Sequence, residues 1–499
     1  MSEAIPGMPE APPPAEPRDA AVVVLVRMGP RGMETFWLRR ERSVSFAAGF
    51  YAFPGGRVDA ADAELPVEGA AAPDSALVAA AARELFEETG VLAARGRTPE
   101  PQALNDARTA LLEGKETFAG VLQRLGLHVD ALDFEPAGRW VTPPFMPVRF
   151  DARFFLVEVP PGTRAEVWPG EAAEGSWVRP ADALTLWHEG RALLHPPNRH
   201  ALNVLSRVRR TVDAVAWLAA PTAADTRIEF QRGIRLVALR TPTLLPATHT
   251  NAWLLGTGEL LIVDPGASEP SELDRLAAHV KGLAAEDCRP VAVVLTHHHL
   301  DHVGGARGTS ERLGVPVWCH ARTAERLPFR ADRLLEDGEE LVLAGSPEMR
   351  WRVLHTPGHA RGHISLLDTA SRAVVVGDMV AGQGTILIDP PEGDMAEYLR
   401  QLSRLRDLPV RALYPAHGPP LPDGPSALDT YLDHRAAREQ RVVNALGDHP
   451  RRLEEVAAEA YADTPVMPYL AERSTLAILE KLRTEGAATE NGGGWVRQH

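Results

Sequence analysis

The chain contains 499 residues with a formal net charge of −14, and 44% of its residues are hydrophobic. This length predicts about three domains, and the composition and acidic balance argue against a general nucleic-acid coat or a binder of anionic membranes. The two cysteines, Cys288 and Cys319, exclude a disulfide framework and indicate a reducing compartment.

The N-terminal end and the apolar runs bear on localisation. Residues 1–19 are rich in Pro, Ala and Glu and lack the basic and apolar regions of a signal peptide, so we expect a disordered tail. No run approaches the ~20 apolar residues of a membrane span. We therefore predict a cytoplasmic protein without a membrane partner. The scarcity of Lys beside abundant Ala, Pro and Gly indicates a bacterial source.

The order of elements predicts a multidomain chain of the α/β and α+β classes. Residues 20–217 mix strand-like runs with one clear helix at 75–89, and residues 218–227 are rich in Ala, Pro, Thr and Asp, which favours a linker. Residues 228–422 alternate short apolar strands with helical stretches. Residues 430–499 indicate short helices followed by a terminal hairpin, and we expect them to form a small third domain.

The helix at 75–89 carries the first group of candidate functional residues. Glu84, Glu87 and Glu88 stand at i, i+3 and i+4, so their carboxylates share one helix face and repel one another unless a cation neutralises them. Such hard oxygen ligands suit Mg²⁺ or Mn²⁺. Gly90 is well placed as the C-cap of this helix. The alternative is a solvated acidic helix end.

The stretch from Arg83 to Gly90, with Gly55 and Gly56 upstream, resembles the Nudix box of diphosphate-cleaving hydrolases. It departs from the family pattern because twenty residues, instead of seven, separate Asp62 from Arg83, which leaves the role of Asp62 open. Similar interruptions occur in the branch that includes peroxisomal coenzyme A diphosphatases. Further downstream resemblances lie at 140–143, 149–155 and 195–197.

This resemblance implies an α/β/α sandwich that binds Mg²⁺ or Mn²⁺. Glu84, Glu87 and Glu88 would hold the metal, and Glu87 is the candidate for activating water. Arg83 would orient the carboxylates, with Gly56 and Gly90 shaping the two ends of the motif. The implied substrate is a small molecule with a diphosphate linkage, such as a coenzyme A or nucleotide derivative.

The second group of candidate residues follows an apolar run at 291–295. Three histidines and an aspartate come within six residues there, and further His and Asp residues stand where later strands end. Clustered His and Asp residues of this kind are typical zinc ligands. The residues concerned are His297, His299, Asp301, His302, His359, Asp378 and His417.

The order of these seven residues resembles the metallo-β-lactamase fold superfamily, and the resemblance extends to 250–251 and 264–266. It implies an αββα sandwich with two Zn²⁺ ions, or Fe or Mn in their place. His297, His299 and His359 would bind one ion and Asp301, His302 and His417 the other, while Asp378 would bridge them. Asp301 would also orient the attacking water and relay a proton. The C-terminal region resembles the winged-helix-like unit of the lactamase-beta-2-like branch, near the glyoxalase II type hydrolases.

Several neighbouring residues have an ordinary interpretation beside a functional one. We expect His298 to be a supporting or surface residue, and His363 to be part of the scaffold in preference to a substrate contact. Arg361 is a possible anion contact under the same reservation. The helix with Arg435, Arg438 and Arg441 could touch phosphates, but a unit that covers the cleft or an interface is favoured.

These patterns together predict a bifunctional metal-dependent hydrolase. One site would hydrolyse a thioester, ester or phosphodiester, and the other would cleave a diphosphate linkage. The alternative is an RNA-processing nuclease of the metallo-β-lactamase fold whose Nudix domain only binds, although the net charge of −14 speaks against nucleic acid. The oligomeric state stays open.

Overall fold

The computed structural model describes residues 12–41, 47–168, 170 and 172–498. Residues 1–11 of the expected tail lie outside these, and the first strand, β1 (Arg18–Gly29), begins inside the segment expected to be disordered. The described chain divides into two compact units, Pro13–Arg232 and Gly233–His499, where three domains were expected. No helix among the described residues combines the length and the apolar character needed to cross a bilayer.

The N-terminal unit is built on a mixed sheet in which β1 is central. Strand β1 pairs in parallel with β9 (Phe150–Val159) and antiparallel with β2 (Gly32–Arg40). The sheet has the order β10-β2-β1-β9-β8, with β3 and β4 attached at β2 and β1. The other strands and helices of the N-terminal unit include β3 (Tyr51–Ala52), β4 (Gly55–Arg57), α1 (Ala60–Glu64), β5 (Val67–Glu68), β6 (Arg95–Gly96), α3 (Pro101–Leu112), α4 (Phe118–Leu125), β7 (Leu127–Asp130), β8 (Glu135–Val141), β10 (Ala172–Val178), α7 (Val215–Leu218) and β11 (Ile228–Gln231).

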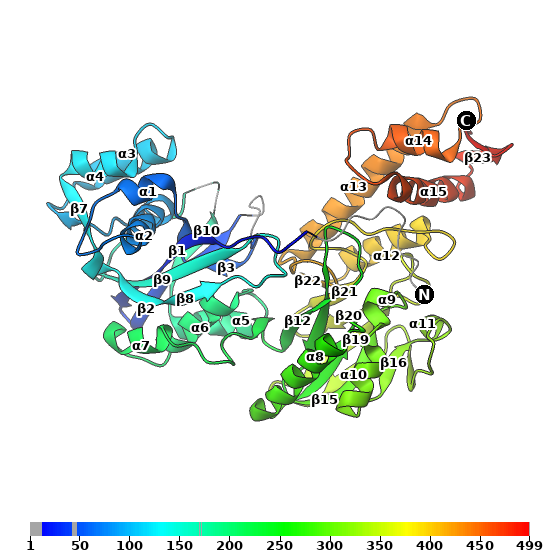
Figure 1. Cartoon of the computed structure of the whole chain (residues 1–499), viewed down its shortest axis with the longest axis horizontal. Coiled ribbons are helices and arrows are strands. Elements are labelled where there is room, and N and C mark those ends of the chain that lie inside the picture. Colours follow the sequence, from blue (N-terminus) through cyan, green and yellow to red (C-terminus); the bar gives the residue numbers. More distant parts are fainter. Residues whose placement is uncertain (1–11, 42–46, 169, 171, 499) are drawn as a thin grey trace. The chain divides into compact units, whose positions relative to one another are not determined.

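Helices cover both faces of this sheet because apolar residues of β1 alternate between them. Val23 and Leu25 pack in a core with α2 (Asp74–Thr89), the helix expected at 75–89. Val24 and Val26 pack in a second core with α5 (Pro180–His188) and α6 (Pro196–Leu205). Figure 1 shows α2 on one side of the sheet and α5 and α6 on the other. Helices and sheet therefore form three layers in this unit.

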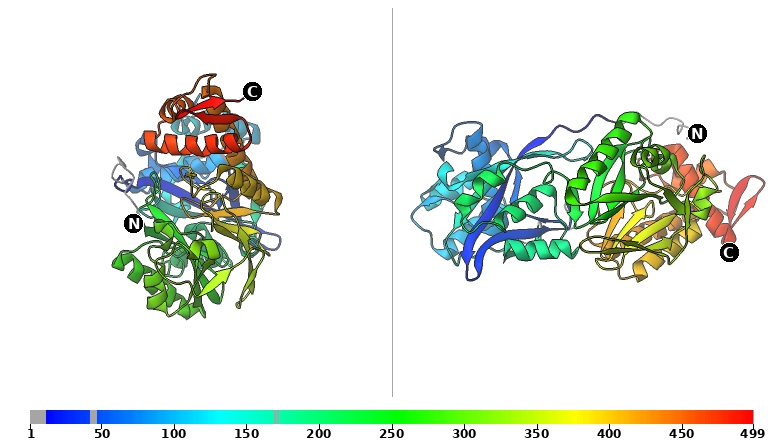
Figure 2. Two further views of the ribbon diagram at one scale, coloured as in Figure 1. Left: turned by 90° about the vertical axis from the view of Figure 1, so that its right-hand side faces the viewer. Right: turned by 90° about the horizontal axis from the view of Figure 1, so that it is seen from below.

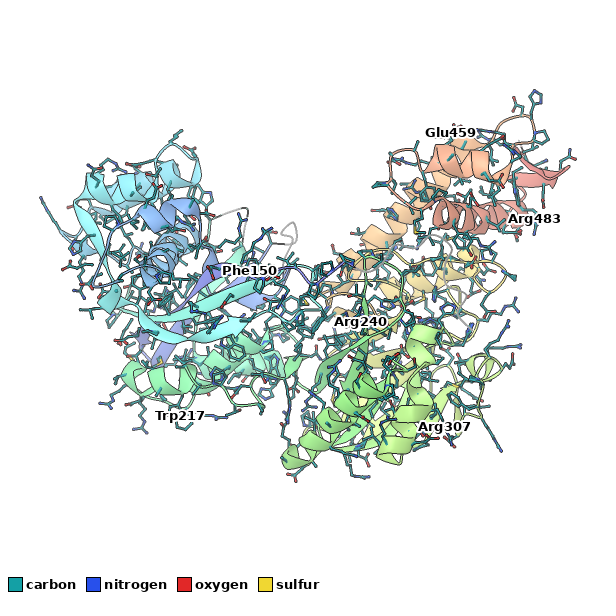
Figure 3. All side chains as sticks on the ribbon, viewed as in Figure 1. Phe150, Trp217, Arg240, Arg307, Glu459 and Arg483 are labelled. Carbon is teal, nitrogen blue, oxygen red and sulfur yellow. The ribbon has the colours of Figure 1, made fainter. Side chains whose placement is uncertain are left out.

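The segment 218–227 is part of the N-terminal unit, and the division between the units falls after Arg232. The buried guanidinium of Arg199 on α6 explains the difference from the expected linker. It donates to the carbonyls of Ala224, Asp225 and Arg227 and pairs with buried Glu229 at 2.9 Å. Trp217 on α7, just before this segment, is largely exposed (Figure 3).

The C-terminal unit contains two sheets with helices outside them. The first has the order β12-β13-β14-β15-β16-β17, and its apolar face packs on α8 and α10. The second has the order β18-β19-β20-β21-β22, and its outer core includes α12 and α13. The elements are β12 (Ile234–Arg240), β13 (His249–Leu255), β14 (Glu259–Val263), α8 (Pro270–Gly282), β15 (Arg289–Leu295), α9 (Leu300–Val303), α10 (Ala306–Leu313), β16 (Val317–His320), α11 (Ala321–Ala324), β17 (Arg333–Leu335), β18 (Glu340–Leu343), β19 (Met349–His355), β20 (Ile364–Asp368), β21 (Ala373–Gly377), α12 (Met395–Asp407) and β22 (Ala412–Pro415).

The inner faces of the two sheets meet through large buried side chains. Trp253 on β13 donates its indole N–H to the carbonyl of Pro415 on β22 at 3.1 Å, and its ring lies edge-on to Tyr414. The expected αββα sandwich is therefore present.

The final helices form one core with this sandwich instead of a separate domain. Helix α13 (Gly424–Ala445) begins before the expected boundary at 430, because Asp423 caps it and accepts from the backbone of Ser426. The core that contains Val374 and Leu354 also contains Val456 and Trp495. The other elements are α14 (Leu453–Ala460), α15 (Pro468–Thr484) and a hairpin of β23 (Ala488–Asn491) and β24 (Gly494–Arg497), which lies next to α15 in Figure 2.

Candidate metal centre

The histidine-rich loop begins where β15 ends, and Asp264 holds it in place. Asp264 follows β14, the parallel neighbour of β15, and accepts from the backbone N–H and the hydroxyl of Thr296 at 2.8 and 2.6 Å. It also accepts from Nδ1 of His302 at 2.9 Å. Gly266 must lack a side chain, because a Cβ there would lie 1.7 Å from the carbonyl oxygen of Asp301.

Three histidines, two from this loop and one from the segment after β19, direct ring nitrogens at one point. Nε2 of His297 and Nε2 of His359 lie 3.0 and 2.9 Å from Nδ1 of His299. The Nδ1 atoms of His297 and His359 are held by the Thr296 hydroxyl and the Leu387 carbonyl, so their Nε2 lone pairs face His299. Since Nδ1 of His299 carries at most one proton, it cannot satisfy both neighbours. Ligands of one tetrahedral zinc ion stand about 3.3 Å apart, so the three nitrogens fit a cation.

A second group of ligand atoms lies beside the first. Nε2 of His417 is 3.4 Å from Asp301 and 3.5 Å from Asp378, and Nε2 of His302 is 3.8 and 3.5 Å from the same two residues. Asp378 also lies 3.5 Å from His359, so it stands between the two groups. Buried Nε2 of His302 and Oδ1 of Asp378 have no hydrogen-bond partner in the described part of the chain. A divalent cation would satisfy both atoms.

Three sets of ligand atoms lie within 4.8 Å of one another. They are His297, His299 and His359; Asp301, His302 and His417; and His297, His302 and Asp378.

Burial and mutual contacts set the protonation states of these side chains. Burial lowers the pKa of His359 to about 3, with His299 adding to the shift. For Asp378, burial alone would raise the pKa, but His417 and His302 outweigh it and hold the pKa well below the usual range. His359 therefore offers neutral imidazole and Asp378 an ionised carboxylate, which are the forms that bind metals. At His302 and His417, burial alone would lower the pKa, but Asp378 and the neighbouring carboxylates outweigh it and raise the pKa of both rings.

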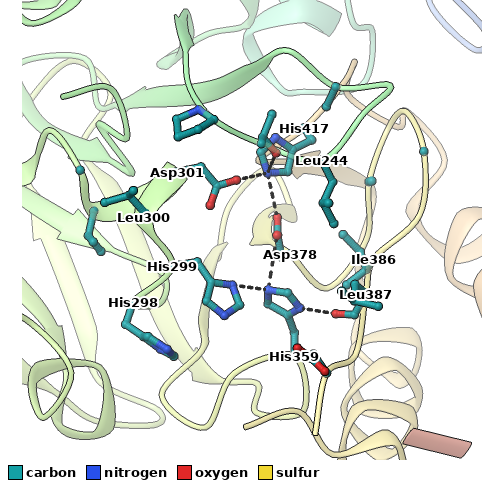
Figure 4. A pocket seen from close by; sticks show the side chains of 18 of the residues that line it. Leu244, His298, His299, Leu300, Asp301, His359, Asp378, Ile386, Leu387 and His417 are labelled. Atoms are coloured by element: carbon teal, nitrogen blue, oxygen red, sulfur yellow. Dashed lines mark hydrogen bonds and ion pairs between the residues drawn. The ribbon is translucent and has the colours of Figure 1, made fainter. Parts of the chain in front are cut away.

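A cavity of about 960 Å³ opens onto this centre. Asp301, His359, Asp378 and His417 line it, and Figure 4 shows the apolar Leu244, Ile386 and Leu387 beside these side chains. Arg307, at the start of α10, also lines the cavity and is labelled in Figure 3.

Two further histidines lie near the centre, one buried behind it and one in the cavity wall. His363 is fully buried, accepts from the backbone N–H of Asp378 at 3.0 Å and contacts Thr356 at 2.9 Å, which matches the expected scaffold role. His298, expected to be a supporting or surface residue, lines the cavity. The role of Asp264 could not be given from the sequence, because its partners Thr296 and His302 come from a distant segment.

In the N-terminal unit, Arg83 is the centre of a buried ion-pair network. It donates twice to Asp62 at 2.8 Å, and also to Glu84 at 2.8 Å and Glu87 at 3.0 Å. The long insertion thus leaves Asp62 in contact with the motif. Asp62 lies in the first turn of α1, where the backbone N–H of Asp59 donates to its carboxylate. Burial alone would lower the pKa of Arg83, but these carboxylates raise it.

Glycines shape the C-terminal half of α2, which carries the three glutamates. The backbone N–H of Gly55 donates to Glu88 at 2.8 Å, and a Cβ at Gly56 would lie 2.3 Å from Glu84. Gly90 ends the helix with φ of 72°. Within the described residues, no ligand set within 4.8 Å includes Glu84, Glu87 or Glu88, so the structure does not bring them together as it does the histidines.

Comparison with known proteins places the C-terminal unit in a family. The family model of the metallo-beta-lactamase superfamily matches residues 245–417. The atrochrysone carboxyl ACP thioesterase of Aspergillus chevalieri is 30% identical over 251 residues, which are 48% of this chain and 76% of that protein. The chain belongs to the metallo-β-lactamase superfamily.

A beta-lactamase-like protein 2 homolog of Caenorhabditis elegans is 29% identical over 248 residues, covering 48% of this chain and 81% of that protein. As a superfamily member the chain is a hydrolase, and its fold implies divalent metal ions. A solved NUDIX hydrolase from Alicyclobacillus acidocaldarius has 31% sequence identity and a TM-score of 0.38, covering 42% of this chain and 99% of that one.

Proposed function

We propose that the metallo-β-lactamase unit hydrolyses an acyl thioester or ester at a dinuclear centre. The observation that carries this proposal is the pair of ligand groups joined at Asp378, at the wall of a cavity with an apolar side that includes Leu244, Ile386 and Leu387. An apolar side suits an acyl chain better than the anionic backbone of a phosphodiester. The proposed ligands are His297, His299, Asp301, His302, His359, Asp378 and His417.

Two cations at such a centre supply a nucleophile at neutral pH and polarise the bond that breaks. They would be Zn²⁺, or Fe or Mn. The protein's own contribution is orientation. Acceptors at Nδ1 keep His297, His302, His359 and His417 in the tautomer that exposes Nε2. Asp301 lines the cavity, where it would accept a hydrogen bond from the attacking water and take its proton.

The contacts of α13 speak against the nuclease alternative. Arg435 and Arg438 are buried and donate to the backbone carbonyls of Ile386 and Ala460, and Arg441 pairs with Asp463. Their charges are therefore already engaged and do not form a surface for phosphates. We propose that the winged-helix-like end of the chain supports the cleft instead.

For the N-terminal unit we propose cleavage of a diphosphate linkage with Mg²⁺ or Mn²⁺. The contacts of Arg83 with Glu84 and Glu87, and of Gly55 with Glu88, support it, because they hold all three carboxylates at one end of α2. Glu87 is the proposed water-activating residue, and a coenzyme A or nucleotide derivative is the proposed substrate. The free, buried Cys288 and Cys319 suit the proposed cytoplasmic setting.

The test is to measure metal content and then assay the whole chain on acyl-coenzyme A thioesters, nucleoside diphosphate derivatives and RNA. The proposal expects thioester hydrolysis that needs two tightly bound ions, together with Mg²⁺-dependent cleavage of a diphosphate. RNA cleavage with a steep salt dependence would instead support the nuclease. If the chain cleaved no diphosphate of the panel, the N-terminal unit would be a binding or scaffold domain instead of an enzyme.

A further inference from the structure

The segment 379–391, called the pocket loop below, faces the metal centre on one side. It follows Asp378 directly, and its residues Ile386 and Leu387 form part of the cavity wall (Figure 4). The carbonyl of Leu387 accepts from Nδ1 of His359 at 2.8 Å. The position of this loop therefore sets both the shape of the cavity and the direction of Nε2 of His359.

On its other side the pocket loop is held by the C-terminal helices. The guanidinium of Arg435 on α13 donates to the carbonyl of Ile386, the residue directly before Leu387. Tyr431, one turn earlier on α13, bonds through its hydroxyl to the backbone N–H and carbonyl of Ala381 at 2.7 and 3.0 Å. Arg473 on α15 donates to Asp389 and to the carbonyl of Pro390.

Arg435 is the most buried of the three residues that hold the pocket loop. It is only 5% exposed, and its guanidinium lies 5.1 Å from the ring centroid of fully buried Tyr398, whose hydroxyl donates to the Met379 carbonyl. A charge buried this far from water is costly unless it is bonded, so its bond to Ile386 is strongly maintained.

We infer that Arg435 is a positioning residue for His359 and acts through the pocket loop. Adjacent carbonyls tie the loop in opposite directions, since Ile386 is bonded outward to Arg435 and Leu387 inward to His359. Losing the outward bond frees the loop to shift and turns His359 away from the point shared with His297 and His299. The inference rests on the proposed metal centre, but not on the choice of substrate.

The chain offers a matched control on the same helix. Arg438 is 7% exposed, and it donates to the carbonyl of Ala460 and to Thr464 within the C-terminal helices. Replacing Arg435 or Arg438 with Met removes one buried guanidinium in each case. Only Arg435→Met removes a bond to the pocket loop.

The experiment compares wild type, Arg435→Met, Arg438→Met and Arg435→Lys by chelator competition for Zn²⁺ and by hydrogen exchange of residues 379–391. Partners that orient a metal ligand typically change affinity 10- to 100-fold, so Arg435→Met should bind one of two ions at least about tenfold more weakly. Its pocket loop should also exchange faster, and Arg435→Lys should recover part of both effects. Arg438→Met should leave both within twofold of wild type.

Zinc affinity of Arg435→Met within twofold of wild type would overturn the inference. So would an equal loss in Arg438→Met, because the effect would then be general destabilisation. A wild-type chain that binds no metal would overturn both the inference and the proposed function. Tight metal binding without thioester hydrolysis would overturn only the proposed substrate.

Discussion

Replacing Asp264 with Asn should weaken metal binding through the tautomer of His302. The carboxylate of Asp264 accepts from Nδ1 of His302 and from the backbone and hydroxyl of Thr296, and all three residues are almost fully buried. An amide keeps one oxygen as an acceptor, and the Thr296 hydroxyl can reverse to accept from the new NH₂ group. The Nδ1–H of His302 would then face a donor, so the ring would move its proton to Nε2, the atom proposed to bind the metal.

The expected losses of stability and of zinc affinity follow from one buried hydrogen bond, from His302 to the charged carboxylate of Asp264. Such a bond contributes about 1.5–3 kcal/mol, so the metal-free protein should lose about that much stability. The same energy corresponds to a drop in affinity of roughly 10- to 100-fold, since 1.4 kcal/mol is a factor of ten. Only the ion of the Asp301, His302 and His417 group should be affected.

Zinc competition with a chromogenic chelator and thermal unfolding of the metal-free chain would measure both effects. Asp368→Asn is the matched control, because Asp368 is also buried in this unit but accepts from Ser371 in a turn away from the centre. If Asp264→Asn bound two zinc ions as tightly as wild type, the assignment of His302 and its tautomer would be refuted. Equal losses of zinc affinity in Asp264→Asn and Asp368→Asn would refute it as well.

Two further predictions concern the N-terminal unit. Glu87→Gln should abolish Mg²⁺-dependent diphosphate cleavage and leave thioester turnover unchanged; diphosphate cleavage at the wild-type rate would remove Glu87 from the catalytic role. Arg199→Met should lower the unfolding free energy of this unit by about 3–5 kcal/mol, because Glu229 loses its buried ion-pair partner. A denaturant melt with a change below about 1 kcal/mol would show that 218–227 behaves as the linker first expected.

Several of the proposed metal ligands could be picked out from the sequence because they stand where a buried strand ends. His297 follows β15, Asp378 follows β21 and His417 follows β22 closely, and parallel neighbours bring such ends to one edge. What holds the ligands could not be predicted. Asp264 is far from His302 in the chain, and His363 supports Asp378 through a backbone bond that no motif encodes.

In two other places the structure differs from the sequence prediction because an arginine is buried. An Arg-rich stretch such as 435–441 has the same composition on a phosphate-binding surface and inside a core, and only the carbonyls that Arg435 and Arg438 reach distinguish them. In the same way, the segment 218–227 has the composition of a linker, but Arg199 fixes it to the N-terminal unit. Neither of these long-range arginine contacts can be predicted from the amino-acid composition of the segment.

We propose that Asp301 acts at a two-metal centre that hydrolyses a thioester. The most direct measurement is acyl-coenzyme A hydrolysis while Zn²⁺ is added to metal-free wild type and to metal-free Asp301→Asn. We expect wild-type turnover to rise until two ions are bound, and Asp301→Asn to stay inactive while melting close to the wild-type temperature. Full turnover by metal-free wild type, or wild-type turnover by Asp301→Asn, would contradict it.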